Sequence, residues 1–325
     1  MQRPASGQNF SCRASGRRYD RGVPPIFTPE KPIRRRERSR LVRAWRLFRT
    51  RRPVTFTEKV QYKMLRDRRP LLVTFADKAA VREYIADRVG EAYLPDAIGV
   101  FDEADALRGL SVGEGLVIKP THGSGAVVVV SPEAAPEARL VRPDWGWIYQ
   151  HVLPSAADPD LLARTAGSWL RKLYGRGPNS EWAYSRIQPR IIVEELLSSP
   201  EGAIPDDLKF FVFHGRCEYV QVDSGRFGER TQDFYSRDWE HLELSGGLPW
   251  ATPGRPRPET LDEMIALAER LAEETDFLRV DLYLLPGRIV VGELTSYPAG
   301  GHSPFEPPSF NERFGSHWTV PNRYR

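Results

Sequence analysis

Apolar residues recur at helical spacing in the first third of the chain. In the stretch LVRAWRLFR, Leu41, Trp45 and Phe48 share one face, and arginines occupy the opposite face. In the stretch DKAAVREYIADRVG, residues 77–90, apolar residues return every four positions and a glycine follows the last of them. Both patterns predict amphipathic helices, the second of which ends at Gly90.

A third helical pattern lies closer to the end of the chain and carries a start signal. The stretch TLDEMIALAERLAEET places Leu261, Ile265 and Leu271 on one face. Thr260 and Glu263 have the spacing of a capping box, in which each side chain hydrogen-bonds the backbone of the other residue. We therefore predict an amphipathic helix that starts directly after Thr260.

Short runs of β-branched and aromatic residues predict strands between these helices. Residues 116–119 and 126–130 form one pair of such runs, and RIIVEELL, KFFVFHG and EYVQVD follow with the look of an antiparallel meander. The stretch FLRVDLYLLPGRIVVGELTSYP predicts a hairpin that turns at Pro286-Gly287. Strands and helices alternate without regular βαβ repetition, which predicts an α+β fold with mainly antiparallel sheets.

Composition limits the class of protein. The chain has 325 residues, 40% of them hydrophobic, which is enough for one large core or for two or three smaller ones. Apolar runs stay well below the roughly 18 residues that cross a bilayer, so we expect no transmembrane segment and a cytoplasmic location. Cys12 and Cys217 lie far apart and outside metal-ligand spacing, which argues against a disulfide framework.

Charge is distributed unevenly along the sequence. Residues 1–70 hold 21 Lys/Arg and 5 Asp/Glu, whereas the remainder holds 26 and 38. Residues 1–40 are rich in Arg, Pro, Gly and Ser, which predicts a disordered basic tail. This tail is either a solvated segment or a binding site for an anionic partner. Nucleic acid is the less favoured partner, because no nucleic-acid-binding motif accompanies the arginines.

The stretch LVIKPTHGSGAVVVV, residues 116–130, is a candidate phosphate-binding element. It carries neither a P-loop nor a complete Rossmann pattern. Lys119 would place a point charge over phosphates, and Gly123 and Gly125, with Ser124 between them, would let backbone N–H groups point inward. An ordinary hairpin with a lysine on its surface explains the same residues.

The hairpin at residues 278–295 is a candidate metal site. Asp281 and Glu293 lie in apolar strands, where an unpaired carboxylate is costly to bury. Two carboxylates that meet on neighbouring strands would bind Mg²⁺, a hard ion that prefers oxygen ligands. The alternative is that each carboxylate pairs with an arginine, above all with Arg279.

Strand register separates these two interpretations. A plain two-residue turn at Pro286-Gly287 puts Asp281 and Glu293 on opposite faces of the hairpin, because side chains alternate along each strand. The metal site therefore requires a three-residue loop or a bulge. Gly287 would tolerate the left-handed conformation that such a bulge needs.

The order of these motifs resembles that of the ATP-grasp superfamily, and most closely its TupA-like branch, from about Phe48 to Trp318. The resemblance rests on FTEKVQYKMLRDRRPLLVTFADKAAVREYI, VIKPTHGSG, RIIVEELL, DLKFFVFHGRCEYVQVDSGRF, RVDLYLLPGRIVVGELTSYPAGG and PFEP. It implies two α+β lobes with mainly antiparallel sheets that clasp ATP, preceded by a reduced helical N-terminal segment. The implied division is a tail at 1–40, the helical segment at 41–112, a small lobe at 113–200 with an insertion at about 131–190, a large lobe at 201–318 and a tail at 319–325.

The resemblance implies that the small lobe binds ATP. Phosphates would be held by two lysines under a glycine lid, adenine by a hinge, and ribose by a glutamate that is either Glu195 or Glu201. In this sequence the two phosphate-binding lysines would be Lys78 and Lys119. The lid would be formed by Gly123, Ser124 and Gly125, and the adenine hinge by Glu194, Glu195, Leu196 and Leu197. The stretch EWAYSRIQPR within the insertion would line a substrate channel or simply pack there.

The resemblance implies that the large lobe carries the chemistry. Asp281, Glu293 and Thr295 would bind Mg²⁺, Lys209 would point into the cleft, and Arg279 would stabilise charge on an acyl phosphate. Most of the superfamily has asparagine where this chain has Thr295, although Glu-Leu-Thr is the usual form in the TupA-like branch.

ATP-grasp enzymes join a carboxylate to an amine through an acyl phosphate, so the resemblance implies an ATP-dependent carboxylate–amine ligase. Its substrates would belong to cell-surface polysaccharide or peptide natural-product biosynthesis. Two other functions stay open, namely a glycosyltransferase or other polysaccharide-modifying transferase, and a non-catalytic protein that binds nucleotide or a polyanion.

Overall fold

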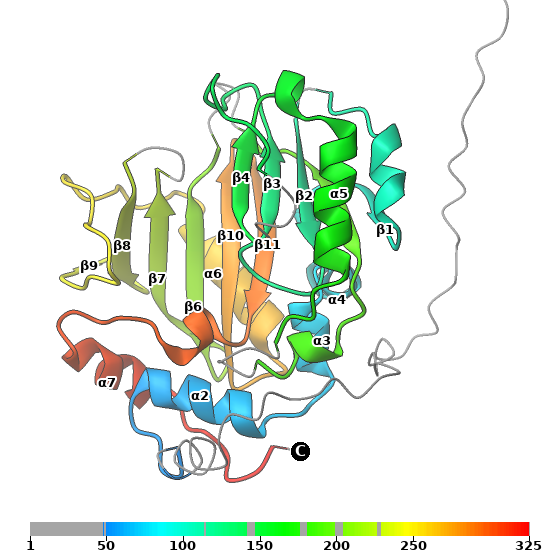
Figure 1. The fold of residues 1–325 in the computed structure, drawn as a ribbon. Helices are drawn as coiled ribbons and strands as arrows, with labels where there is room; N and C mark the ends of the chain where they lie inside the picture. Colours follow the sequence, from blue (N-terminus) through cyan, green and yellow to red (C-terminus); the bar gives the residue numbers. More distant parts are fainter. Residues whose placement is uncertain are drawn as a thin grey trace, which may run out of the picture.

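The described part of the chain contains two β-sheets with helices packed against them (Figure 1). The computed structural model describes residue 48 and residues 50–324, apart from 114, 142–146, 176–180, 199–203 and 226–228. The predicted tail at 1–40 and the start of the predicted helix at Leu41 lie outside these residues. Within them, no helix combines the length and the apolar character needed to cross a bilayer.

The smaller sheet has five strands in the order β1-β5-β2-β3-β4. They are β1 (Ala97–Phe101), β2 (Leu116–Pro120), β3 (Val127–Val130), β4 (Tyr149–Val152) and β5 (Ile191–Glu195). Neighbours are antiparallel except for the parallel pair β3 and β4. The hairpin predicted from residues 116–130 is confirmed, and helix α5 (Pro159–Leu170) packs against this sheet.

The larger sheet has six strands in the order β11-β10-β6-β7-β8-β9, and all neighbours are antiparallel. They are β6 (Asp207–Phe213), β7 (Arg216–Ser224), β8 (Thr231–Ser236), β9 (His241–Leu242), β10 (Phe277–Leu285) and β11 (Arg288–Thr295). The predicted meander and the predicted C-terminal hairpin are therefore confirmed. With both sheets mainly antiparallel, the fold class is α+β, as expected.

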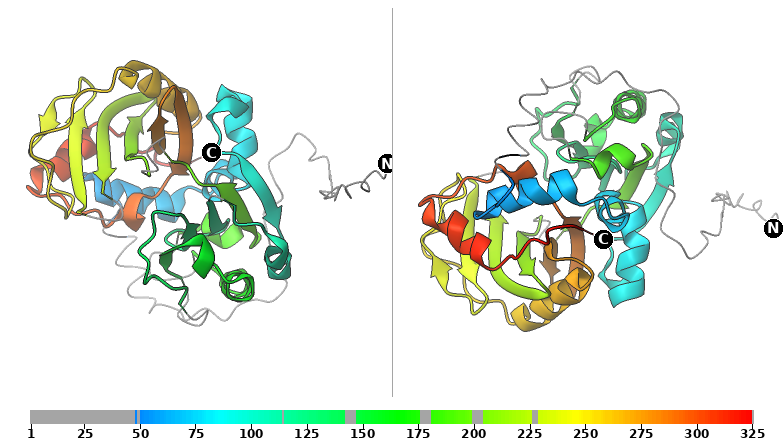
Figure 2. Two further views of the ribbon diagram at one scale, coloured as in Figure 1. Left: turned by 90° about the horizontal axis from the view of Figure 1, so that it is seen from above. Right: turned by 90° about the horizontal axis from the view of Figure 1, so that it is seen from below.

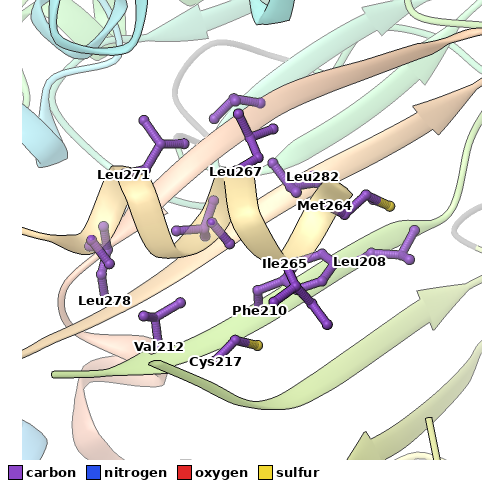
Figure 3. Close-up of a cluster of buried hydrophobic side chains, with 14 of the residues drawn as sticks. Leu208, Phe210, Val212, Cys217, Met264, Ile265, Leu267, Leu271, Leu278 and Leu282 are labelled. Carbon is purple, nitrogen blue, oxygen red and sulfur yellow. The ribbon is translucent and has the colours of Figure 1, made fainter. Parts of the chain in front are cut away.

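Helix α6 (Leu261–Ala272) covers one face of the larger sheet. Its apolar side, which includes Ile265 and Leu271, packs onto β6 and β10 through side chains such as Phe210 and Leu278 (Figure 3). The helical spacing in the sequence identified this side correctly, because a period of 3.6 residues places i, i+4 and i+7 together.

The predicted capping box at the start of α6 is wrong. Thr260 has φ −88° and ψ 9°, outside the extended conformation of a capping residue, and its side chain makes no capping hydrogen bond. A tight turn, in which the Leu261 N–H donates to the Pro258 carbonyl at 3.1 Å, fixes this backbone. A capping box does occur elsewhere, at Thr55 and Glu58.

The opposite face of the larger sheet is covered by α2 (Phe56–Arg66) and α7 (Ser309–Ser316), which contact each other (Figure 2). Helices α3 (Leu71–Ala76) and α4 (Ala80–Val89) follow α2, and α4 ends at Gly90 as predicted. Short 3-10 helices are η1 (Glu91–Tyr93), η2 (Ala104–Gly109), η4 (Pro154–Ala156), η5 (Tyr184–Arg186) and η6 (Pro298–Gly301).

The helical segment at 41–112 is not separate from the two sheets. Its strand β1 pairs with β5 of the smaller sheet, and Phe75, Val81 and Ile85 join the core beneath α6. On the other face, the Phe56 ring lies among the aromatic side chains of Phe211, Phe213, Phe277, Phe305, Phe314 and Trp318, with ring centroids 5.2–6.1 Å away.

A buried ion cluster joins α2 to the start of β10 and to the last residues of the chain. Lys63, fully buried, bonds Asp67 at 2.9 Å and also Asp276. Asp276 Oδ2 accepts hydrogen bonds from Trp318 Nε1 and from the Tyr324 hydroxyl, each at 2.8 Å. The stretch 319–324 is thus docked against α2 rather than free.

The charges in this cluster decide its dependence on pH. Burial alone would raise the pKa of Asp67, but Arg69 and Lys63 hold it below its ordinary value. Burial would likewise raise the pKa of Asp276, and Lys63 again outweighs it. Carboxylates with a lowered folded-state pKa stabilise the fold above their unfolded pKa of about 4, and that stabilisation disappears as the pH falls through the folded values.

We predict that Lys63→Met lowers the free energy of unfolding at pH 7 by about 3 kcal/mol, because two buried carboxylates lose their shared cation. Urea unfolding followed by circular dichroism measures this, with Arg66→Met on the exposed side of the same helix as the control. The difference between wild type and Lys63→Met should shrink below about pH 4. Equal losses in both variants, or a difference independent of pH, would contradict the assignment.

Candidate functional site

A β-bulge places the two predicted metal carboxylates on one face of the larger sheet. Near the turn, the hairpin pairs Leu285 with Arg288, but further along it pairs Asp281 with Glu293. The register changes at Gly292, which has no partner in the ladder. The predicted bulge is confirmed, although it lies at Gly292 rather than at the turn.

The bulge also explains which side chains of β11 enter the core. Val291 before it and Leu294 after it both pack beneath α6, although a regular strand would direct them to opposite faces. A Cβ on Gly292 would come 2.6 Å from Cε2 of Tyr283, so the tyrosine ring lies directly over the bulge. Gly287, with φ +70°, serves the two-residue turn instead.

Arg279 holds Asp281 in a bidentate ion pair. Its Nε and Nη2 atoms donate to the two carboxylate oxygens at 2.7 Å each. The same Nη2 donates to the Thr295 hydroxyl at 3.1 Å and lies 3.8 Å from Glu293 Oε2. The pairing considered as the alternative for Asp281 is therefore present, while Glu293 keeps a 30% exposed side chain.

Lys209 extends this network across β6 and β7. Its Nζ atom lies 2.7 Å from Asp207 Oδ2, 3.4 Å from Asp281 Oδ2 and 3.5 Å from Asp223 Oδ2. Burial alone would lower the pKa of Lys209, but Asp281 and Asp207 hold it above its ordinary value. Lys209 is thus held in its charged form on the same face as Asp281, and its orientation into the ATP cleft stays a prediction.

Lys119 and Glu194 form the nucleotide side of the predicted site. Lys119 Nζ lies 2.8 Å from Glu194 Oε2, and Arg82 on α4 bonds the other oxygen at 3.0 Å. Lys78 donates to the Gly123 carbonyl. Burial and the like charge of Lys119 lower the pKa of Lys78, and Glu293 opposes this shift.

One pocket brings the two halves of the predicted site together. Its polar lining includes Lys78, Lys119 and Glu194 from the predicted nucleotide side, and Glu293 from the hairpin that carries the predicted metal carboxylates. The remaining lining residues are Phe75, Val81, Arg82, Ile85, Leu94, Pro95, Val291, Gly292 and Leu294. Burial alone would raise the pKa of Glu293, but Lys78 first, and then Arg279 and Lys209, hold it below its ordinary value.

The glycine loop after β2 lies against an aromatic wall. A Cβ on Gly123 would come 2.2 Å from Trp147 Cζ2 and 2.9 Å from Tyr174 Cδ2. Trp147 and Tyr174 stack with centroids 5.3 Å apart, and Trp147 Nε1 donates to the Ser124 carbonyl at 2.6 Å. Gly125 has φ +87°, which favours glycine.

The hinge residues span the end of β5, since Glu194 and Glu195 are its last two residues and Leu196 and Leu197 follow it. Glu195 is exposed, and its N–H donates to the Asp96 carbonyl at 3.0 Å, while Leu196 and Leu197 are partly buried. Glu201, the other candidate for the ribose, lies outside the described residues. The choice between Glu195 and Glu201 therefore stays a prediction.

Four charged residues of the site were missed in the sequence. Asp207 could have been found, since it precedes Lys209 by two positions and shares its strand face. Arg82, Asp223 and Glu181 carry no local signal, because elements distant in sequence bring them to the site. Burial, and then the charge of Glu293, raise the pKa of Glu181 to about 7.

The site residues fit Mg²⁺, the ion that the predicted chemistry requires. Asp281 and Glu293 supply hard oxygen donors from directly opposed positions, and Glu293 is partly exposed. The Thr295 hydroxyl is engaged with Arg279. The described residues contain no group of three His, Cys, Asp or Glu side chains that could hold a metal alone, so phosphate and water oxygens would complete the coordination.

We compared the chain with curated proteins and with solved structures. No curated protein matches the sequence. One similar solved structure is the ATP-grasp ligase PsnB complexed with a minimal precursor, with 14% sequence identity, coverage of 70% of this chain and 54% of that chain, and a TM-score of 0.37. A second is an L-amino acid ligase from Bacillus licheniformis, with 14% identity, coverage of 75% of this chain and 49% of that chain, and a TM-score of 0.41. A third is a D-alanine–D-alanine ligase from Helicobacter pylori, with 12% identity, coverage of 76% of this chain and 62% of that chain, and a TM-score of 0.38. The chain spans about half the length of the first two.

The sequence itself settles the family. The model of the TupA-like ATP-grasp family matches residues 58–319, which is most of the chain. That span begins inside α2, includes the glycine loop and the hinge, and ends just after α7. The chain belongs to the TupA-like ATP-grasp family.

Proposed function

We propose that this chain is an ATP-dependent ligase that joins a carboxylate to an amine through an acyl phosphate. The observation that carries the proposal is the single pocket lined by Lys78, Lys119 and Glu194 on one side and by Glu293 on the other. The pocket thereby combines two lysines that would bind phosphates with a carboxylate, Glu293, that would bind a divalent metal ion.

ATP would lie between the two sheets. Lys78 and Lys119 would bind its phosphates, and the loop at Gly123–Gly125 would close over them. The hinge at Glu194–Leu197 would present backbone groups to adenine. Lys78 has a pKa lowered mainly by burial, so a bound phosphate would favour its charged form.

The reaction would proceed on the charged face of the larger sheet. A substrate carboxylate oxygen would attack the γ-phosphorus as ADP leaves, and the amine nitrogen would then attack the acyl carbon as phosphate leaves. Asp281 and Glu293 would hold Mg²⁺, which would supply positive charge to the phosphates. Arg279, which bonds Asp281, would stabilise negative charge on the acyl phosphate, and Lys209, whose pKa is raised, would add a second positive charge beside it.

The identity of the two substrates, the carboxylic acid and the amine, would determine the biosynthetic pathway in which the ligase acts. We propose amino acids, uronic acids or short peptides as substrate classes, within cytoplasmic steps of cell-surface polysaccharide or peptide natural-product biosynthesis. A screen that measures ADP release across these acids and amines, with Mg²⁺ present, tests the proposal. Absence of ATP binding under these conditions would overturn it.

We predict that Glu293→Gln lowers ADP release by about two orders of magnitude or more, because a neutral amide removes a metal ligand and the anion that faces Lys78. Steady-state ADP release with the best acid–amine pair measures this. Glu137→Gln, an identical change at an exposed position of the small lobe, should keep wild-type activity. A glycosyltransferase would transfer sugar without forming ADP, and a non-catalytic binder would be indifferent to Glu293→Gln.

We predict that Gly123→Ala weakens binding of a non-hydrolysable ATP analogue with Mg²⁺ by about ten-fold. The added methyl group overlaps Trp147 and Tyr174, so the loop must move away from the lysines at a cost of about 1–3 kcal/mol. Calorimetric titration measures the affinity. Gly109→Ala, where nothing lies within 4 Å of the added Cβ, is the matched control. Equal affinities of the two variants would show that the loop does not cover the nucleotide.

A further inference from the structure

Lys78 lies on a short connection rather than in a helix or a strand. It stands between α3, which ends at Ala76, and α4, which begins at Ala80. Lys119, the other lysine of the predicted nucleotide side, belongs instead to β2, where the ladder with β5 fixes its backbone. A connection has no ladder of its own, so other contacts must set the position of Lys78.

The residues on either side of Lys78 attach this connection to the larger sheet. Phe75 and Val81 are buried in the core beneath α6, together with Ile85. The Lys78 side chain reaches the other way, because its Nζ atom donates to the Gly123 carbonyl in the small lobe. Without contacts between its own backbone and the smaller sheet, Lys78 would therefore follow the larger sheet.

Three contacts hold the connection to the smaller sheet. The Lys78 N–H donates to the Thr121 carbonyl at 3.1 Å, and the Thr121 N–H donates to the Arg190 carbonyl at 2.9 Å. Arg190 Nη2 donates to Asp77 Oδ2 at 3.1 Å, which closes a ring of contacts back to the residue before Lys78. Arg190 thus takes part in two of the three contacts, one through its backbone and one through its side chain.

Asp77 links this ring to the start of α4. Its Oδ1 atom accepts hydrogen bonds from the N–H groups of Ala79 at 2.9 Å and Ala80 at 3.4 Å, while Oδ2 faces Arg190. Burial raises the pKa of Asp77, and the charge of Arg190 is the largest influence that opposes this shift. Removing one partner of a buried ion pair leaves an uncompensated charge, so loss of Arg190 would disturb Asp77 and the residues next to it.

We propose that Arg190 is a positioning residue for nucleotide binding, which fixes Lys78 through Asp77 and Thr121. This inference rests on the proposed ligase function, in which Lys78 binds the ATP phosphates. It adds a role for a residue that does not itself line the pocket. Without the ring of contacts, the ammonium group of Lys78 would lose its place beside the glycine loop, and the phosphates would lose part of their binding charge.

The test measures the affinity of the full chain for Mg·ADP by calorimetry, in a double-mutant cycle. Arg190→Met removes the guanidinium group and keeps an apolar stem, and it should weaken Mg·ADP binding about ten-fold, because a small displacement of a binding group is costly. In the Lys78→Gln background the same change should weaken binding by less than about two-fold, since the lysine through which Arg190 acts is gone. Arg164→Met, at an exposed position of α5, is the matched control and should bind as wild type does.

Three further measurements separate positioning from a general effect on the fold. Arg190→Lys keeps a cation opposite Asp77 and should retain part of the affinity. Asp77→Asn keeps an oxygen for the start of α4 but removes the charge, so it should weaken Mg·ADP binding to the same extent as Arg190→Met. Adenosine has no phosphates, so its affinity should be equal in wild type and in Arg190→Met. Circular dichroism confirms that each variant is folded.

The remaining outcomes would contradict the inference in different ways. Failure of wild type to bind Mg·ADP would overturn the proposed ligase function, and the role of Arg190 with it. Binding of Mg·ADP by Arg190→Met at the wild-type affinity would overturn the role of Arg190 alone. Equal losses from Arg190→Met with and without Lys78 would show that Arg190 acts by another route. A parallel loss of adenosine affinity would show that Arg190 supports the whole site rather than Lys78.

Discussion

The arrangement of charge in this protein depends on one unpaired residue in a hairpin. Gly292 shifts the register of β11 by one position, so that Glu293 faces the same side as Asp281 instead of the core beneath α6. A regular ladder would bury that carboxylate among leucines and valines at a cost of several kcal/mol. The bulge therefore allows one face of the hairpin to pack its apolar side chains beneath α6 while the other face carries the carboxylates.

That charged face is one half of a divided surface. Towards α2 and α7 the same side of the larger sheet is aromatic, and towards the small lobe it is ionic. The ionic half holds the carboxylates Asp207, Asp223, Asp281 and Glu293 and the cations Lys78, Lys209 and Arg279. These four carboxylates exceed the three cations, so a bound metal ion would bring the face closer to balance.

Sequence periodicity predicted this architecture because the strand period of two and the helix period of 3.6 are local properties. The metal-site hypothesis also required a three-residue loop or a bulge, because a plain two-residue turn would put Asp281 and Glu293 on opposite faces. The start of α6 was mispredicted because a turn at Pro258 decides the backbone of Thr260. Arg82 and Glu181 could not be predicted, because their neighbours come from distant segments. Lys63 resembled any surface lysine of a helix, and only tertiary packing shows it to be buried.

The cluster around Lys63 also constrains the order in which the chain can fold as it is made. Lys63 lies in α2, whereas Asp276 and Tyr324, which complete its surroundings, lie more than 200 residues later. During synthesis the surroundings of Lys63 stay incomplete until Asp276 and Tyr324 have been made. The small sheet is complete at Glu195, whereas the large sheet needs strands up to Thr295, so the small sheet can form first during translation.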